Sequence, residues 1–185
     1  SGHTGYLGDC IFVFDPEFAR YCRTEAAKLP ARPETELVLG YFSDNELPLA
    51  RGQLARFRAL PASEAGRQEA DRWVAARRAQ GRPESEDEAA FTEHVVDTYC
   101  ATVRAALRAH VPHHLFLGPR LYGSSLRDDA VLRACGRHVD VLSINYYGAW
   151  PPQPDLMDRW VRVSGRPFLI TEWYAKAEDS GLANT

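Results

Sequence analysis

The segment "LVLGYFSDNELPL", residues 37 to 49, contains an almost unbroken apolar and aromatic run that leads into Asp44, Asn45 and Glu46. A run without polar alternation predicts a strand buried on both faces, as in a parallel sheet covered by helices. Polar and acidic residues are unexpected at the end of such a strand. The segment therefore indicates a fold class and a place where functional groups collect.

Apolar runs of the same kind recur along the whole chain. They are "CIFVF" (10–14), "ELVLGYF" (36–42), "HLFLG" (114–118), "VDVLSINYY" (139–147) and "PFLITEW" (167–173). Helical patterns lie between them, at residues 16–29, 86–110, 126–138 and 153–165. This alternation predicts an α/β fold whose parallel strands are joined by right-handed crossovers. Residues 51–85, which are polar and rich in Ala and Arg, predict a helical insertion at one rim of a single domain.

The composition excludes several classes of protein. With 45% hydrophobic and 25% charged residues the chain is typical of a globular domain. A formal charge of −3 without a Lys/Arg-rich run argues against nucleic acid and anionic membranes as partners. The four cysteines lack zinc-ligand spacing, so we expect buried free thiols and neither a metal nor a cofactor. The start of the chain shows no signal-peptide pattern.

Polar side chains follow every predicted strand. Asp15, which precedes Pro16, is expected to cap a helix. The other strand ends carry Asp44, Asn45, Glu46, Arg120, Asn145, Tyr146, Tyr147, Glu172 and Trp173. The carboxyl ends of parallel strands share one edge of a sheet, so these groups should meet there. A single glutamate at such a place is most often a cap or a solvated residue. Two glutamates with tyrosines and an asparagine match glycoside hydrolysis, in which one carboxyl protonates the leaving oxygen and the other attacks the anomeric carbon.

The same segments resemble a known family. "GYFSDNE", "HHLFLGPRLYG", "VDVLSINYY" and "PFLITEW", with "FVFDPEF" before them, are similar to successive strands of the retaining glycoside hydrolases of clan A, in their agarase-like branch. The resemblance implies a (β/α)8 barrel of the TIM type. It places Glu46 on the general acid/base at the end of the fourth barrel strand and Glu172 on the nucleophile at the end of the seventh. Tyr146 or Tyr147 would keep Glu172 ionised.

The resemblance also implies how the substrate is held. Asn45 would contact the 2-hydroxyl of the sugar, while Asp44, Arg120 and Trp173 would line the substrate site. The expected substrate is a galactan or agarose-like polysaccharide, and the expected location is secreted or periplasmic. The carboxyl groups of Glu46 and Glu172 should lie roughly 5 to 5.5 Å apart, as in retaining enzymes.

The chain departs from the family in its length. A complete barrel takes about 250 residues and eight strands, whereas this sequence offers candidates only for strands 3 to 7. We therefore expect an incomplete barrel, either part of a longer enzyme or completed by another chain. Its unpaired edges favour self-association. A non-catalytic carbohydrate-binding or scaffold protein is the alternative, whereas nucleotide binding is disfavoured because no phosphate-binding glycine loop follows a strand.

Overall fold

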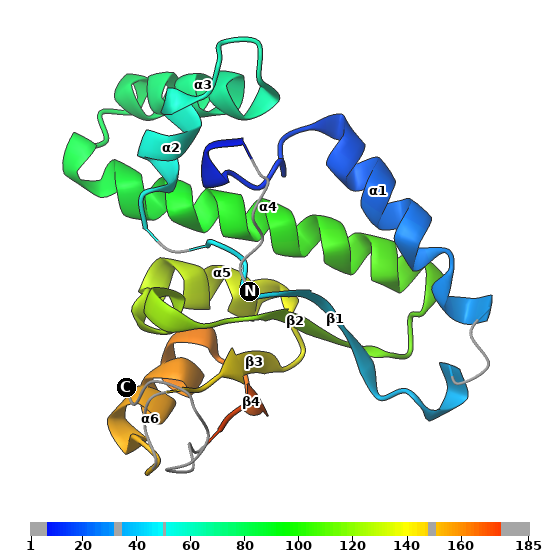
Figure 1. The fold of residues 1–185 in the computed structure, drawn as a ribbon. Coiled ribbons are helices and arrows are strands. Elements are labelled where there is room, and N and C mark those ends of the chain that lie inside the picture. Colours follow the sequence, from blue (N-terminus) through cyan, green and yellow to red (C-terminus); the bar gives the residue numbers. More distant parts are fainter. Residues whose placement is uncertain (1–6, 32–34, 50, 148–150, 175–185) are drawn as a thin grey trace, which may run out of the picture.

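The computed structural model describes residues 7–31, 35–49, 51–147 and 151–174, which form helices around short parallel strands (Figure 1). The α-helices are α1 (Pro16–Ala26), α2 (Gln53–Ala59), α3 (Ala65–Ala79), α4 (Asp87–His110), α5 (Asp129–His138) and α6 (Pro154–Ser164). The strands are β1 (Gly40–Asn45), β2 (Leu115–Arg120), β3 (Leu142–Asn145) and β4 (Phe168–Glu172). Short 3-10 turns occupy Leu7–Asp9, Leu29–Ala31, Thr35–Leu37, Glu84–Glu86 and Gly123–Arg127.

The described strands form two parallel pairs, β1 with β2 and β3 with β4. A parallel bridge between Leu121 and Ile144 joins the pairs. There the N–H of Leu121 donates to the carbonyl of Ser143 at 2.9 Å, and the N–H of Asn145 donates to the carbonyl of Leu121 at 2.8 Å. The strands thus follow one another in sequence order with their carboxyl ends at one edge. The predicted α/β class is confirmed, although the described strands do not close into a barrel.

The register brings the strand ends level. Asn45 lies opposite Arg120 in the first pair, and Asn145 lies opposite Glu172 in the second. In the second pair Ile144 faces Ile170 but Asn145 faces Glu172, so Thr171 is an additional residue in β4. Such a bulge re-aims the side chains beside it. The edge of the sheet is therefore shaped by an irregularity as well as by regular pairing.

The strand predicted at residues 10–14 is wrong. This segment forms turns, in which the N–H of Val13 bonds the carbonyl of Ile11 at 2.8 Å. Three of its apolar side chains, Cys10, Ile11 and Val13, are buried all the same, whereas Phe12 is exposed. The ring of Phe14 packs on those of Phe57 and Phe91 at 5.4 and 6.0 Å. The run is apolar because it packs against α2 and α4, not because it pairs with a strand.

The predicted cap at the start of α1 is confirmed. The side chain of Asp15 accepts a hydrogen bond from the N–H of Glu17 at 2.8 Å. Residues 51–85 contain α2 and α3, and β1 begins later than expected because Thr35–Leu37 form a 3-10 turn. Cys10, Cys100 and Cys135 are buried free thiols, as expected, and Cys22 is half-buried.

Helix α4 is the centre of the fold. In Figure 1 it crosses the molecule between the group formed by α1, α2 and α3 and the group formed by α5 and the strands. Buried residues recur along it at helical spacing, as expected for a helix that packs on several sides: Phe91, Val95, Val96, Tyr99 and Cys100. None of the described helices is both long and apolar enough to cross a membrane.

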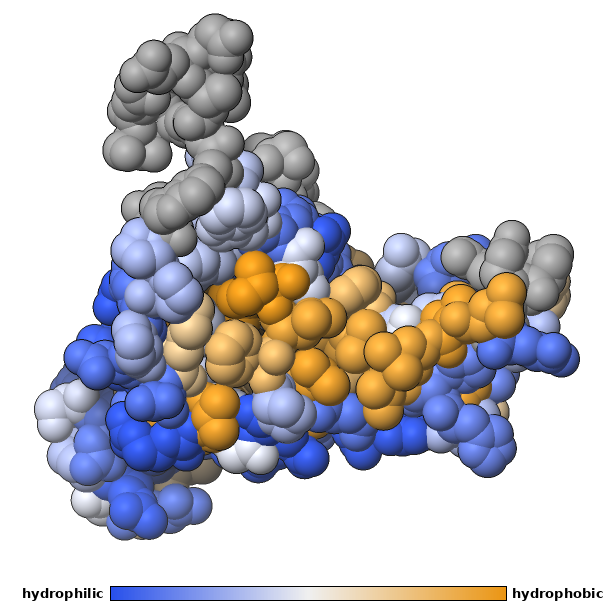
Figure 2. Space-filling view, turned by 90° about the horizontal axis from the view of Figure 1, so that it is seen from below, coloured by the Kyte–Doolittle hydropathy of each residue, from blue (hydrophilic) through white to orange (hydrophobic). Residues whose placement is uncertain are grey.

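Hydrophobic surface remains on the side of the strands. Figure 2 shows a band of hydrophobic residues across the face of the molecule seen from below. The exposed apolar side chains include Phe42 in β1, Leu169 in β4 and Leu39 just before β1, so they lie in or beside the two outermost described strands. Exposed apolar surface of this kind is typical of sites that bind another surface or a ligand.

Candidate active site at the strand ends

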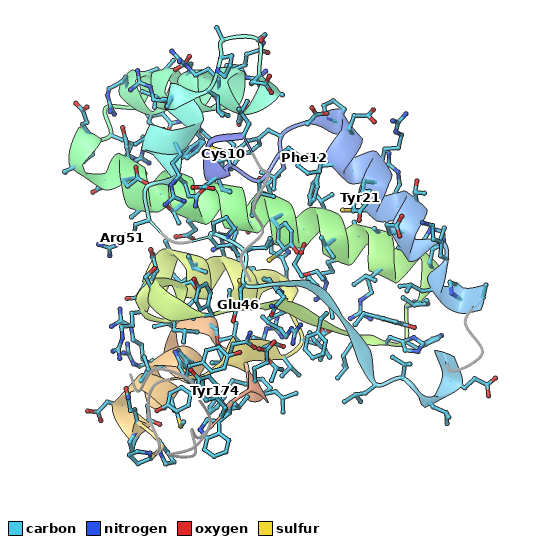
Figure 3. All side chains as sticks on the ribbon, in the orientation of Figure 1. Cys10, Phe12, Tyr21, Glu46, Arg51 and Tyr174 are labelled. Carbon is cyan, nitrogen blue, oxygen red and sulfur yellow. The ribbon has the colours of Figure 1, made fainter. Side chains whose placement is uncertain are left out.

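Glu46 stands at the point where β1 ends (Figure 3). Its φ of 56° lies in the left-handed region, which costs an L-residue roughly 1 to 2 kcal/mol. Its N–H donates to the carbonyl of Arg120 at 3.0 Å, which extends the pairing of β1 with β2 beyond Asn45. Strained backbone of this kind concentrates at functional sites. Here it turns a half-buried glutamate out of the strand at its carboxyl end.

The carboxyl group of Glu46 is bound by a neutral donor. The Nδ2 of Asn145 donates to Oε1 of Glu46 at 2.9 Å and to Oδ1 of Asn45 at 3.1 Å. Asn145 is only 1% exposed, so both bonds lie in a largely desolvated place. A single amide from β3 thus connects the two polar residues at the end of β1.

The carboxyl group of Glu172 has a different environment. Arg120 donates from Nη1 to Oε1 of Glu172 at 2.5 Å, and the hydroxyl of Tyr147 donates to Oε2. The guanidinium of Arg120 also lies over the ring of Phe42, 5.6 Å from its centroid. Each oxygen of Glu172 thus accepts a hydrogen bond, one of them from a cationic donor.

Both glutamates affect the pKa of Tyr147. Burial raises the pKa of Tyr147 above its ordinary value, and so do its hydrogen bond to Glu172 and the negative charges of Glu172 and Glu46, while Arg120 opposes them. The phenol therefore remains a hydrogen-bond donor at neutral pH. The charges of both glutamates thus act on this one phenol, although only Glu172 is bonded to it.

Two residues predicted for the site point elsewhere. Asp44 accepts a hydrogen bond from the hydroxyl of Tyr99 on α4 at 3.0 Å, and it lines a cavity of about 330 Å³ between β1, α1 and α4. The ring of Tyr146 packs on Trp160 in the core, and its hydroxyl donates to the carbonyl of Pro151 at 3.1 Å. Of the two candidate tyrosines, it is Tyr147 whose hydroxyl bonds the carboxyl of Glu172. Trp173 is exposed just beyond β4.

The sequence prediction gave no role to Asn145 or Thr171. The hydroxyl of Thr171 donates to Oδ1 of Asn145 at 2.9 Å, and it also lies 3.2 Å from the carbonyl oxygen of Ile144. The available signal was an asparagine within the apolar run "VDVLSINYY", because a buried amide needs partners. No feature of the sequence predicts the bulge that brings Thr171 to Asn145.

A cavity of about 380 Å³ lies beside Tyr147, whose hydroxyl bonds the carboxyl of Glu172. Its wall includes the rings of Tyr122, Tyr147 and Tyr174 together with the polar side chains of Arg127 and Gln153. The rings of Tyr147 and Tyr174 have centroids 5.1 Å apart. Aromatic walls with a few polar groups are typical of small-molecule sites. Across the part of the chain with described positions, no three His, Cys, Asp or Glu residues are grouped as a metal site requires.

Comparison with solved structures gives clear matches. The crystal structure of BpGH50 is 27% identical and superposes with a TM-score of 0.78, covering 96% of this chain and 42% of that one. The agarase AgWH50C is 24% identical with a TM-score of 0.74, covering 98% of this chain and 29% of that one. An exo-beta-agarase is 23% identical with a TM-score of 0.71, covering 92% and 28%.

The remaining comparisons set the limits of the match. No family model and no curated protein matches the chain. The chain spans less than half the length of each of these structures. The chain is thus similar in structure to part of BpGH50 and of the two agarases, and the predicted agarase-like resemblance is confirmed.

Proposed function

We propose that this chain carries the catalytic pair of a retaining glycoside hydrolase that cleaves β-glycosidic bonds in a galactan or agarose-like polysaccharide. The observation that supports it best is the contrast between two glutamates at one edge of the sheet. Glu172 lies between a guanidinium and a phenol, which suits a nucleophile that stays ionised. Glu46 is bound by a neutral amide, which suits an acid that loses and regains a proton.

The proposed reaction has two steps. In the first, Glu172 attacks the anomeric carbon, the glycosidic bond breaks, and Glu46 gives its proton to the leaving oxygen. In the second, Glu46 takes a proton from water as the water oxygen attacks the same carbon, and Glu172 leaves as a carboxylate. Asn45 holds the 2-hydroxyl of the sugar, a contact that strengthens in the transition state.

We place the four strands β1 to β4 at positions four to seven of a (β/α)8 barrel. Their parallel order and their level carboxyl ends support this placement. Trp173 and the tyrosine-lined cavity next to Glu172 supply aromatic surface on which sugar rings stack. Agarose-like substrates are proposed because two of the similar structures are agarases by name.

The test is hydrolysis of agarose oligosaccharides and other galactans, with the anomeric configuration of the first product followed by proton NMR. We expect retention of configuration, and loss of turnover in Glu46→Gln and Glu172→Gln. Glu17→Gln, which changes a solvent-exposed glutamate of α1, is the matched control and should keep activity. A product of inverted configuration would refute the retaining mechanism. Binding without turnover by the unaltered protein would favour the carbohydrate-binding alternative.

A further inference from the structure

Asn145 occupies a central place between the strands that carry the catalytic pair. It is the last residue of β3, and its backbone N–H is held by the carbonyl of Leu121 at 2.8 Å. Its side chain contacts β1 through Asn45 and Glu46, and β4 through Thr171. Side chains held by regular strands are positioned more accurately than those on loops.

The contacts fix the orientation of this amide. Thr171 donates to Oδ1 of Asn145 at 2.9 Å, so the carbonyl half of the amide faces β4. The two hydrogens of Nδ2 are then directed at Oδ1 of Asn45 and Oε1 of Glu46. An ionised carboxylate only accepts hydrogen bonds, so the NH2 half is the one that can face Glu46. The bulge at Thr171 is what brings its hydroxyl into line.

We propose that Asn145 is a positioning residue that, through one buried amide, sets the orientation of both the Glu46 carboxyl and the Asn45 amide. The inference rests on the proposed function for its purpose and on the described contacts for its geometry. Because Oε1 of Glu46 accepts from Asn145, the proton passed to the leaving group is carried by Oε2. The same N–H bond stabilises the carboxylate while Glu46 acts as a base.

The orientation of Asn45 follows from the same contact. Since Oδ1 of Asn45 accepts from Asn145, the NH2 half of Asn45 is turned to the other side. Thr171 acts on Glu46 only indirectly, because its hydroxyl bonds the side chain of Asn145.

The direct test is an NMR titration of the Asn145 side-chain amide in the 185-residue chain. Its resonances are assigned by their absence in Asn145→Leu. Among the described residues, the charged and titratable groups that act on this site include Arg120, Glu172 and Tyr147. We expect the Nδ2 proton shifts to move as Glu46 ionises, to lose this movement in Glu46→Gln, and to keep it in Glu172→Gln. Shifts that ignore pH, or that follow Glu172 alone, would overturn the proposal.

Catalysis supplies a second test that a purely structural role would not pass. Removing the donor should slow substrates with poor leaving groups by about tenfold, with KM little changed. Formation of the glycosyl-enzyme from substrates whose leaving group needs no acid should change by less than about threefold. Equal losses on both kinds of substrate would contradict a role through Glu46. If Asn145→Leu does not fold, Thr171→Val makes the same comparison with Asn145 left in place.

The two tests separate this inference from the proposed function. The NMR titration requires no turnover, so it decides the contact between Asn145 and Glu46 even in an inactive protein. If that titration behaves as expected while Glu46→Gln keeps full hydrolysis, the proposed function fails and the contact stands. If hydrolysis depends on Glu46 but the amide does not respond to it, the inference about Asn145 fails alone.

Discussion

Tyr147→Phe is the change that most specifically probes the surroundings of the proposed nucleophile. It keeps the ring and removes the hydroxyl that donates to Oε2 of Glu172. A hydrogen bond to a charged group contributes about 1.5 to 3 kcal/mol. The side chain of Glu172 is 33% exposed, and solvent screening reduces this to about 1 to 2 kcal/mol. The bond also holds the Glu172 carboxyl in one orientation, so its loss lets the group turn away from the anomeric carbon. At about 1.4 kcal/mol for each factor of ten, attack by Glu172 should slow by up to about 5- to 30-fold.

The assay is the rate of covalent labelling by a 2-deoxy-2-fluoro glycoside, followed by mass spectrometry of the intact protein. Tyr146→Phe is the matched control, because it makes the same chemical change in the adjacent residue, whose hydroxyl bonds the carbonyl of Pro151. We expect the control to label within about twofold of the unaltered protein. Labelling of Tyr147→Phe at the unaltered rate, or an equal loss in both variants, would refute the reasoning.

Three further predictions concern stability and are checked by urea unfolding. Glu46→Gly should be more stable than Glu46→Ala by about 0.5 to 1 kcal/mol, since glycine adopts the φ of 56° without strain, and equal stabilities would contradict this. The raised pKa of Tyr147 means that the unfolded chain releases this proton first, near the ordinary value of 10.0, so its contribution is present below that pH and lost above it. The fall in stability above that pH should therefore be smaller in Tyr147→Phe, and an unchanged slope would argue against the shift. Gly136→Ala should lower the free energy of unfolding by about 2 kcal/mol or more, because a Cβ there would lie 2.0 Å from the carbonyl oxygen of Ser164. A variant of unaltered stability would show that α5 and α6 are not so closely packed.

An apolar run in the sequence does not by itself decide whether a segment pairs as a strand. "GYFSDN", "LFLGPR", "LSIN" and "FLITE" pair as strands, whereas "CIFVF" is equally apolar and forms turns against helices. Composition does not separate the two cases, whereas the position of a neighbouring strand does. That position depends on contacts between distant parts of the chain, which a local pattern does not contain.

The candidate site shows the same limit at the level of single side chains. Alternation along a strand already places Asp44 and Asn45 on opposite faces, so the contact of Asp44 with Tyr99 could have been expected. The partnership of Asn145 with Thr171 could not, because it depends on a one-residue bulge in the pairing of β3 with β4. Glu46 and Glu172 were predicted because the sequence itself shows a glutamate directly after a strand-like run. A bulge leaves no comparable pattern in the sequence.

The central claim is that Glu172 is the nucleophile and Glu46 its acid partner. The most direct measurement is the identity of the residue labelled by a mechanism-based fluoro glycoside, found by peptide mass spectrometry on this chain and on any longer natural form that contains it. Attachment of the sugar to the carboxyl of Glu172, with Glu46 unmodified, is the predicted result. Attachment at Glu46, or turnover without any covalent intermediate, would contradict it.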